Sequence, residues 1–462
     1  MKKPEDGNEL PTGWAWKTIG SVAEVNPPRP KYEGFSDDES ATFIPMAAVD
    51  DESGTVVSPE ERTLGSIRRK SYLTFTSGDV LFAKITPCME NGKSAIVPPI
   101  SSGLGFGSTE FHVLRPSPAV LPEYLWRFVR QKSYRQAAEE NMSGSVGQMR
   151  VPAAYVKDSV LPLPPTIDEQ RAIMHLVDAI EERHTRASAH LRVARRAVRR
   201  FRQSVLAAAC SGRLTPDWRE VHADTQSVER ALTELGGNKR RRTSDDDLSD
   251  LALPEVPESY VISTISRASI MLQYGTSKRA EAINAGVPVL RMGNIQDGRL
   301  ELDELKYTPM DHEIERLMLE EGDLLFNRTN SPELVGKSAV FHELKPMTFA
   351  SYLIRLRFTP GVVEPDFVNY WINSAWGKAW ARHVKTDGVS QSNINGTKLG
   401  AMPLPLPPIA EQREIVHRAS RMLDLADGLL ARIDAASRGV EHGSQSVLVK
   451  AFRGGLMQAG PV

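Results

Sequence analysis

The feature that most constrains this chain is an internal duplication. Residues 161–165 read Leu-Pro-Leu-Pro-Pro and recur at 404–408, and a Glu-Gln-Arg triplet follows each run, at 169–171 and at 411–413. In both copies a Gln-Ser-Val-Leu run begins 33 positions after the glutamine of that triplet, although the residues between differ almost completely. A repeat of about 243 residues is far longer than a solenoid unit, so the sequence predicts one domain type present twice.

Shorter matches upstream stay close to the same register. Gly-Asp-Val-Leu-Phe at 78–82 corresponds to Gly-Asp-Leu-Leu-Phe at 322–326, and Gly-Lys-Ser-Ala at 92–95 corresponds to the same four residues at 336–339, both at an offset of 244. Short apolar runs of this kind predict strands. Because proline continues neither a helix nor a central strand, each globular domain is expected to end at its Leu-Pro-Leu-Pro-Pro run.

A long helical pattern follows each proline run. Apolar or small residues recur at steps of four and three over five heptads, which is typical of a coiled-coil seam. The predicted seam residues are Ile173, Val177, Ile180, Leu191, Val198, Phe201 and Val205 in the first helix, and Ile415, Met422, Leu429, Ile433, Val440 and Val447 in the second. Two matching seams in one chain can pair with each other. We favour an antiparallel pair, although the linker is long enough for a parallel one.

Together these features predict an α+β fold that is internally duplicated, with two globular, β-rich α/β domains separated by a long two-helix coiled coil. The expected segments are a first globular domain at 1–165, a first helix at 166–214, a linker at 215–254, a second globular domain at 255–408 and a second helix at 409–458. The linker carries a basic run at 239–242 and an acidic run at 245–247, as solvated linkers commonly do.

Composition narrows the class of protein. The 57 Lys and Arg residues against 58 Asp and Glu residues exclude a globally basic nucleic-acid coat, so any DNA contact must come from local patches. Two cysteines, Cys88 and Cys210, cannot build a disulfide framework or a cysteine-rich zinc site, which fits a reducing cytoplasm. The histidines show no metal-binding spacing. With no apolar leader and no run near ~18 apolar residues, we expect no export signal and no contact with a membrane.

The length of the predicted seam suits nucleic acid. A helix from residue 173 to 208 is roughly 50 Å long at ~1.5 Å per residue, about one and a half turns of B-DNA. Two similar but non-identical binding domains on such a frame would read two different short sequences separated by a gap, as symmetric dimers read palindromes.

The order of these motifs resembles the specificity subunits of Type I restriction-modification systems, which serve defence against foreign DNA. The resemblance rests on a Leu-Pro-x-Gly-Trp start at 10–14, the Gly-Asp-x-Leu-Phe strand, and Leu-Pro-Leu-Pro-Pro followed by Glu-Gln-Arg and a long helix, nearly all of it repeated. It implies two target recognition domains, each reading half of a bipartite double-stranded DNA site, and helices that space the halves and dock two adenine methyltransferase subunits. Two endonuclease/translocase subunits would complete the complex.

The same resemblance implies a non-catalytic chain without cofactors of its own. S-adenosylmethionine would belong to the partner methyltransferase, and ATP and magnesium to the partner endonuclease. Two other functions stay open: a coiled-coil scaffold whose paired domains bind protein, and a specificity module with its own methyltransferase or nuclease activity. The Gly-Lys-Ser runs lack the earlier glycine of a phosphate-binding loop, and Asn26-Pro-Pro is followed by Arg29 instead of a base-stacking aromatic residue.

Three polar loops in each domain are candidates for DNA contact, because Arg, Lys, Asn, Gln, Ser and Thr on loops read bases and bind phosphates. In the first domain the candidates are Lys31, Lys84, Thr86, Asn91, Gln148 and Arg150; in the second they are Thr276, Ser277, Lys278, Arg328, Thr329, Asn330, Gln391, Ser392 and Asn393. Tyr352 and the tryptophans at 371, 376 and 380 are expected in the core.

The first helix is strongly basic. Residues 183–213 contain nine arginines and no acidic residue, whereas Arg192 and Arg199 correspond to Asp434 and Glu441 in the second helix. Three interpretations remain open: a solvated helix face, phosphate contact, or a docking surface for the methyltransferase. In the second helix Leu423, Leu425 and Leu430 widen the apolar stripe, which predicts additional burial against the domain or a partner.

Overall fold

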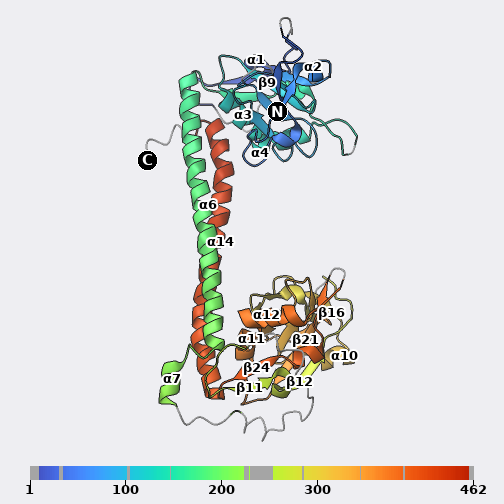
Figure 1. Cartoon of the computed structure of the whole chain (residues 1–462), viewed down its shortest axis with the longest axis vertical. Coiled ribbons are helices and arrows are strands. Elements are labelled where there is room, and N and C mark those ends of the chain that lie inside the picture. Colours follow the sequence, from blue (N-terminus) through green and yellow to red (C-terminus); the bar gives the residue numbers. More distant parts are fainter. Residues whose placement is uncertain are drawn as a thin grey trace. The chain divides into compact units, whose positions relative to one another are not determined.

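The computed structural model describes residues 10–30, 35–100, 103, 105–145, 147–222, 228, 253–282, 286–343, 345–388 and 391–456. The chain divides into two compact units, 1–192 with 434–462 and 193–433. Each unit combines one globular domain with part of each of the two long helices, α6 (Ile167–Cys210) and α14 (Ile409–Phe452) (Figure 1).

The globular part of the first unit contains two four-stranded sheets. The first has the order β2-β9-β6-β7 and is antiparallel throughout; the second has the order β4-β3-β8-β5 and contains one parallel pair, β3 with β8. The strands are β2 (Ala23–Val25), β3 (Ser40–Ile44), β4 (Glu60–Thr63), β5 (Leu73–Phe75), β6 (Val80–Ala83), β7 (Ser94–Ile96), β8 (Gly105–Gly107) and β9 (Phe111–Pro116). The short helices are α1 (Ile19–Val22), α2 (Leu64–Ile67), α3 (Pro122–Arg130), α4 (Lys132–Glu139) and α5 (Ala153–Asp158).

The second unit repeats this plan. Its main sheet has the order β12-β21-β17-β19, the counterpart of β2-β9-β6-β7, and a smaller sheet β16-β13-β20 again contains one parallel pair. The strands are β12 (Ser269–Tyr274), β13 (Val287–Leu290), β16 (Lys306–Thr308), β17 (Leu324–Asn327), β19 (Ser338–Val340), β20 (Thr348–Phe349) and β21 (Leu353–Phe358). The helices are α9 (Ile265–Ala268), α10 (His312–Arg316), α11 (Pro365–Asn373), α12 (Ala375–Val384) and α13 (Gly396–Gly400). The duplicated α+β fold expected from the sequence is confirmed.

The recurring Gly-Asp-x-Leu-Phe motif has a shared structural cause. Gly78 and Gly322 adopt the left-handed backbone conformation, with φ of 85° and 86°, at the turn before the buried strand. The following aspartates are buried and bind an arginine on the neighbouring strand with both carboxylate oxygens: Arg115 binds Asp79 at 3.0 and 2.8 Å, and Arg357 binds Asp323 at 2.7 and 2.9 Å. This pairing joins β6 to β9 and β17 to β21.

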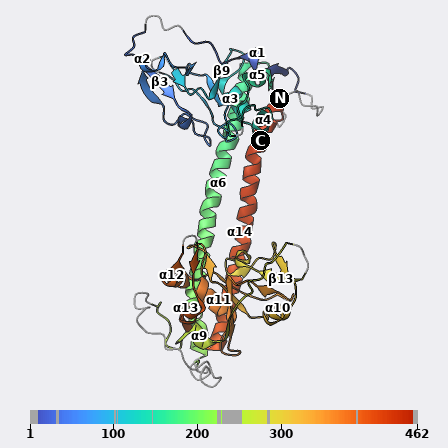
Figure 2. The same ribbon diagram turned by 90° about the vertical axis from the view of Figure 1, so that its right-hand side faces the viewer.

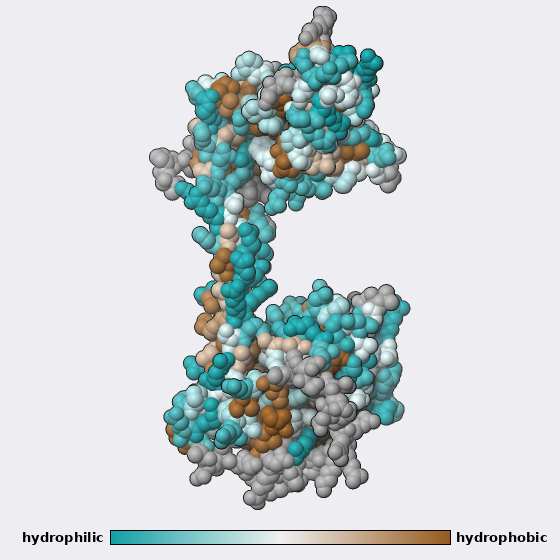
Figure 3. Space-filling view, viewed as in Figure 1, coloured by the Kyte–Doolittle hydropathy of each residue, from teal (hydrophilic) through white to brown (hydrophobic). Residues whose placement is uncertain are grey.

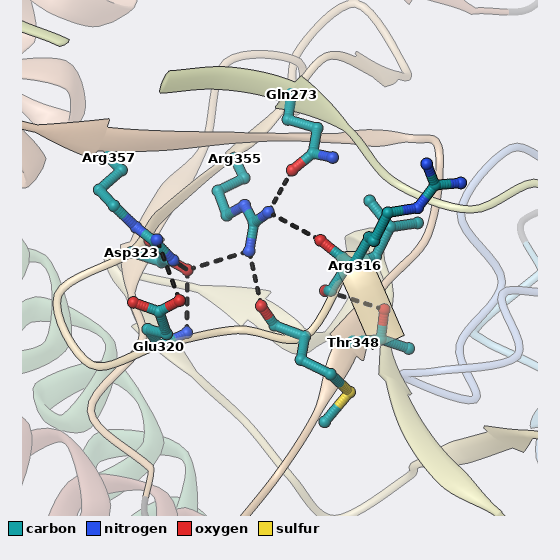
Figure 4. A network of polar contacts seen from close by, with 9 residues as sticks. Gln273, Arg316, Glu320, Asp323, Thr348, Arg355 and Arg357 are labelled. Atoms are coloured by element: carbon teal, nitrogen blue, oxygen red, sulfur yellow. Dashed lines mark hydrogen bonds and ion pairs between the residues drawn. The ribbon is translucent and has the colours of Figure 1, made fainter. Parts of the chain in front are cut away.

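The second copy extends this network with a further buried arginine (Figure 4). Arg355 donates to the main-chain carbonyl of Met318 at 2.6 Å and to Asp323 at 3.3 Å, and it also binds Gln273. The equivalent position in the first copy is Val113, because Leu81 pairs with Val113 as Leu325 pairs with Arg355. The two copies therefore share the backbone arrangement of this sheet but differ in the buried side chain at this position.

The proline runs form edge strands. Among the described residues, β10 (Val160–Leu163) pairs only with β1 (Ala15–Thr18), and β24 (Pro403–Leu406) pairs only with β11 (Val261–Thr264), each in a two-stranded antiparallel ladder. An edge strand tolerates proline because its missing N–H can face away from the ladder. The long helices α6 and α14 begin within a few residues of these strands.

The Glu-Gln pair of each repeat connects the long helix to its domain. Glu169 accepts a hydrogen bond from the indole N–H of Trp14 at 2.8 Å, and Glu411 accepts one from the hydroxyl of Tyr260 at 3.1 Å. Gln170 donates to the carbonyl of Ala119 at 3.0 Å. These buried contacts explain why the two residues recur while most of the helix sequence does not.

In the first unit the start of α6 packs against the end of α14. Ile173, Val177 and Val447 are buried in one cluster, and the ring of Phe452 contacts Tyr124 of α3 with centroids 4.7 Å apart. Further from the domain, His184 approaches Gly443. As residue numbers rise along α6 they fall along α14, so the two segments are antiparallel. In this unit Ile180, Leu191 and Val440 are half-buried.

In the second unit the end of α6 and the start of α14 run antiparallel (Figure 2) and bury residues in one hydrophobic cluster together with residues of α11 and α12. Val205 and Ile415 are buried as predicted, and Val198 and Ile433 are half-buried. The prediction was wrong for three seam residues that are well exposed: Phe201 at 41%, Met422 at 37% and Leu429 at 38%.

The residues that follow Phe201 and Met422 in the sequence are buried instead. Arg202 is 8% exposed and pairs with Asp427, and Leu423 is 6% exposed. The reason is that these segments bury a second face against the globular domain, where Leu423 packs with Val205 and Leu206 of α6 in the cluster that includes Trp371. A heptad pattern describes only the contact between two helices, so it misplaces residues where a third surface is present.

The helix ends differ slightly from the expected segments, because α6 ends at Cys210 and α14 at Phe452 instead of near 214 and 458. In the predicted linker the structure contains a short helix, α7 (Pro216–Val221), and the charged runs at 239–247 lie outside the described residues. No helix among the described residues has both the length and the apolar character that a membrane span requires.

Candidate nucleic-acid interface

In the second unit the predicted contact residues lie around one small sheet. β18 (Thr329–Asn330) pairs with β23 (Ser392–Asn393), which also pairs with β22 (Thr386–Asp387). The chain leaves the buried strand β17 at Asn327, and β18 follows after Arg328 in a separate three-stranded sheet, where both of its residues are half-buried. Two loops that are more than 60 residues apart in the sequence, around 328–330 and 391–393, are brought together by this pairing.

Arg328 lies at the centre of this edge. Its guanidinium carbon is 4.9 Å from the centre of the Tyr274 ring, and its Nη2 donates to the side-chain oxygen of Asn393 over 3.3 Å. A longer contact of 3.4 Å joins Nη1 to the carbonyl of Ser351. Asn393 also donates to the hydroxyl of Thr329 at 2.8 Å. The long distances leave the guanidinium weakly bound and stacked on a ring, which is an arrangement that can exchange partners when a ligand arrives.

The surrounding polar side chains differ in accessibility. Gln391 is exposed, and Asn330 and Thr329 are half-buried. Ser392 is fully buried and donates to Asp387, so its hydroxyl already has a partner inside the protein. Among the amides on or beside β18 and β23, Gln391 is exposed, whereas Asn330 and Asn393 are half-buried.

The loop at 276–278 is also drawn into internal contacts. Thr276 is buried and its hydroxyl donates to Glu313 at 2.6 Å, while Lys278 forms ion pairs with Asp311 and Glu313. The hydrogen bond from Thr276 and the nearby Lys278 lower the pKa of Glu313, and Lys278 also lowers the pKa of Asp311. Both carboxylates are therefore ionised near neutral pH and bind the Lys278 ammonium. Ser277 between them is exposed. A base contact from Thr276 or Lys278 would require these partners to be released.

The first unit has the same edge with different residues. Arg150 lies opposite Ile85, and its guanidinium binds Glu110 through two hydrogen bonds of 2.9 Å each. This pairing with Arg150 lowers the pKa of Glu110, and Lys84 nearby acts in the same direction. The guanidinium of Arg150 is thus held in a bidentate ion pair, unlike that of Arg328.

The other candidates of the first unit surround this pair. Asn91 and Gln148 are exposed, and the carbonyl of Gln148 accepts a hydrogen bond from Arg150 at 2.9 Å. Thr86 is half-buried and donates to Glu90. Lys31, predicted to contact DNA, lies outside the described residues.

Main-chain hydrogen bonds show which positions correspond. The N–H of Lys84 donates to the carbonyl of Glu110 at 2.9 Å, and the N–H of Arg328 donates to the carbonyl of Tyr352 at 3.0 Å. The bridge partner of Ile85 is Arg150, and that of Thr329 is Asn393. One backbone frame therefore presents Lys84, Glu110 and Arg150 in the first copy and Arg328, Tyr352 and Asn393 in the second.

Two members of these triplets were missed from the sequence. Glu110 was not a candidate, because an acidic residue does not signal DNA contact. Tyr352 was expected in the core, and that prediction was wrong: it is 42% exposed, because Ala350 and Leu353 on either side of Ser351 and Tyr352 take the inward positions of this turn. By contrast Trp371 and Trp380 are buried as expected.

The Asn-Pro-Pro run has a structural role. Asn26 takes a left-handed conformation with φ of 54°, and its side chain bonds to the ring of His112 at 3.0 Å and to the N–H of Val113 at 3.0 Å. His112 is itself buried, which lowers its pKa, and its other ring nitrogen lies 2.8 Å from the carbonyl of Val151. Asn26 thus ties the edge of the main sheet to the segment that leads into α5.

Comparison with known proteins agrees with this architecture. Residues 11–191 match the family described as the Type I restriction modification DNA specificity domain. The specificity subunit of the Type I restriction enzyme EcoAI from Escherichia coli is 25% identical over 493 residues, which cover 96% of this chain and 83% of that protein.

Two solved structures share the fold. One is a chain of a type I restriction-modification system studied for its complex assembly and conformational transition, with a TM-score of 0.67 at 20% identity, covering 96% of this chain and 99% of the other. The second is the HsdS subunit from Thermoanaerobacter tengcongensis, with a TM-score of 0.59 at 20% identity, covering 97% and 99%.

A domain present twice, each copy joined to a long helix and presenting a different polar edge, defines a class of duplicated recognition subunits. The chain is similar to the specificity subunits of Type I restriction-modification systems, over residues 11–191 by the family match and over 96% of its length by comparison with the EcoAI subunit.

Proposed function

We propose that this chain reads a bipartite double-stranded DNA site, one globular domain for each half, and performs no chemistry itself. The observation that carries the proposal is the correspondence of Lys84, Glu110 and Arg150 with Arg328, Tyr352 and Asn393 on one backbone frame. A constant frame with different donors and acceptors is what two readers of different sequences require, because each base pair presents its own donor and acceptor pattern in the major groove.

The electrostatics of the two edges support different readouts. In the first copy Glu110 holds Arg150, leaving Lys84 as a cation with no carboxylate partner among the described residues. In the second copy Arg328 has no carboxylate partner within the same described ranges and stacks on Tyr274. A guanidinium held in this way suits bidentate contact with guanine, and the amide of Asn393 or Gln391 suits adenine.

The long helices are proposed to dock two methyltransferase subunits, with two endonuclease/translocase subunits joining the complex. In the second unit Met422, Leu425 and Leu429 lie at spacings of three and four on one face of α14 and are exposed, Leu425 at 61%. Figure 3 shows such apolar residues interrupting the hydrophilic surface of the helices. Exposed leucines on a long helix favour a protein partner, because a solvated helix would place polar residues there.

In this assignment the cofactors belong to the partners. S-adenosylmethionine would bind the methyltransferase, and ATP and magnesium the endonuclease, all in the cytoplasm where host DNA is methylated. Leu425→Asp should abolish co-purification with the methyltransferase subunit, whereas Ala431→Asp, at an exposed position about 120° around the helix from Leu425, should retain it.

Methylation mapping of adenines in the host genome tests the main proposal. The expected result is one bipartite motif that disappears when the gene is deleted. Replacing residues 1–160 by the same segment of another family member should then change one half-site and leave the other intact. A motif that changes in both halves, or methylation that persists in the deletion strain, would contradict the proposal.

A further inference from the structure

A groove in the second unit separates the end of α6 from the globular domain. It has a volume of about 600 Å³ and is lined by α6, by α12 and by the loop at 332–337. Its cationic lining residues are Arg199 and Arg202 from α6, Lys337 from the residue before β19, and Lys378 and Arg382 from α12. Two acidic residues, Asp297 and Glu333, share the lining, so positive charge predominates.

Three of these cations lack a counter-ion. Arg202 pairs with Asp427, and Lys337 donates to the side-chain oxygen of Gln296 at 2.9 Å. Within the described ranges, the side chains of Arg199, Lys378 and Arg382 have neither a carboxylate nor a hydrogen-bond partner. Partial burial lowers the pKa of Lys378, and Arg202, Lys337 and Arg382 lower it further, against an opposing effect of Asp297. Like charges gathered in this way repel one another until an anion enters.

The groove continues directly from the recognition edge. Its loop begins two residues after β18 ends at Asn330, and the backbone N–H groups of Leu334 and Val335 both bond to the carbonyl of Ser331, which keeps this segment compact. An extended polyanion that meets Arg328 would reach the start of the groove loop within about 13 Å, since Pro332 is four residues further along and each residue spans at most ~3.3 Å. That distance is about four base pairs of DNA.

We propose that this groove binds the DNA phosphate backbone beside the second half-site, with Arg199 of the spacer helix and Lys378 and Arg382 of the globular domain as the contacts. The inference rests on the function proposed above. It adds a role for α6, which contacts DNA directly as well as setting the spacing between the two half-sites. Phosphate contacts position a reader without reading sequence, so the groove would fix the register of the second domain on the duplex.

The first copy provides an internal comparison. Arg199 corresponds to Glu441 in α14, and Arg382 corresponds to Glu139 in α4, so both positions reverse their charge. Lys378 corresponds to Arg135, whose guanidinium donates to the carbonyls of Glu90 and Arg130 and is thereby occupied. The copies share a fold, so fold alone does not require the cations of the groove.

The test uses the full-length chain and a duplex carrying the mapped target, with affinity measured over a range of salt concentrations. Arg199→Gln, Lys378→Gln and Arg382→Gln should each weaken binding about five- to tenfold at 0.1 M salt and reduce the slope of log affinity against log salt by about one. The triple variant should reduce the slope by two to three. The matched control is Arg200→Gln, which removes an exposed arginine one residue further along α6 and outside the groove.

Ethylation interference on the same duplex locates the contacts. In the wild-type protein, ethylated phosphates flanking the second half-site should block binding, and in the triple variant those phosphates should cease to matter while those of the first half-site remain. All three side chains are exposed, so thermal melting of the variants should match the wild type. Unchanged slope and interference in folded variants would overturn the inference and leave the proposed function standing; a wild-type chain that binds no duplex would overturn both.

Discussion

The side-chain amide of Gln412 donates to the main-chain carbonyl of Val362 at 2.9 Å, which ties the first turn of α14 to the loop before α11. The same amide donates to Pro407 at 2.8 Å and accepts from the N–H of Glu364 at 2.8 Å. With the side chain fully buried, these bonds fix the direction in which the helix leaves the domain.

We therefore expect Gln412→Ala to destabilise the second unit by about 1 to 3 kcal/mol, because it leaves buried main-chain groups without partners. Arg413→Ala, which changes the exposed next residue, should alter stability by less than about 0.5 kcal/mol. Denaturant unfolding of both variants measures the difference. Equal effects would show that helix attachment does not depend on this amide.

The shifted helix contact in the second unit is tested by truncation. Leu423→Ala should cost about 2 to 5 kcal/mol, since Leu423 is buried in the main cluster. Met422→Ala should cost less than about 1 kcal/mol, because Met422 is exposed. Thermal melts compare the two variants. A larger loss of stability in Met422→Ala than in Leu423→Ala would support the regular heptad seam predicted from the sequence.

Two histidines should respond to pH in opposite directions. Burial lowers the pKa of His112 below its ordinary 6.5, so its contribution is intact above that value, and stability is lost as pH falls and the unfolded chain takes up the proton. The hydrogen bond to Asp366 raises the pKa of His342, so its contribution is present below 6.5 and is lost as pH rises through the higher folded value.

Thermal melts of His112→Asn and His342→Asn between pH 5 and 9 separate these effects. His112→Asn should flatten the loss of stability on the acid side, and the stability deficit of His342→Asn should shrink towards alkaline pH. A deficit of His342→Asn that grows with pH would refute the role given to Asp366.

Specificity should divide between the two edges. Arg328→Ala should weaken target binding by about 1 to 3 kcal/mol and relax one base position in the second half-site, with the first half-site unchanged. Competition binding against single-base variants of the target measures this. Arg421→Ala, on the exposed surface of α14, is the control, and loss of discrimination in the first half-site would contradict the division.

The sequence predicted most of the candidate site as polar loops, but not which of their side chains contact one another. Arg328 and Asn393 were both candidates because polar residues recurred at corresponding places, and the structure brings them within 3.3 Å. Which side chains remain accessible depends on long-range partners: Glu313 binds the hydroxyl of Thr276, which is 37 residues away, and Glu110 binds Arg150, which is 40 residues away. Carboxylates this far away in the sequence leave no local pattern.

The sequence by itself determined the duplication, the strand at each Gly-Asp motif and the position of both long helices, because repeats, turn glycines and apolar periodicity are local signals. Only the tertiary structure decided that Arg202 and Leu423, and not Phe201 and Met422, face inward. The physical reason is that burial on a helix depends on every surface that covers it, and here a globular domain covers a face that the pairing of two helices leaves open.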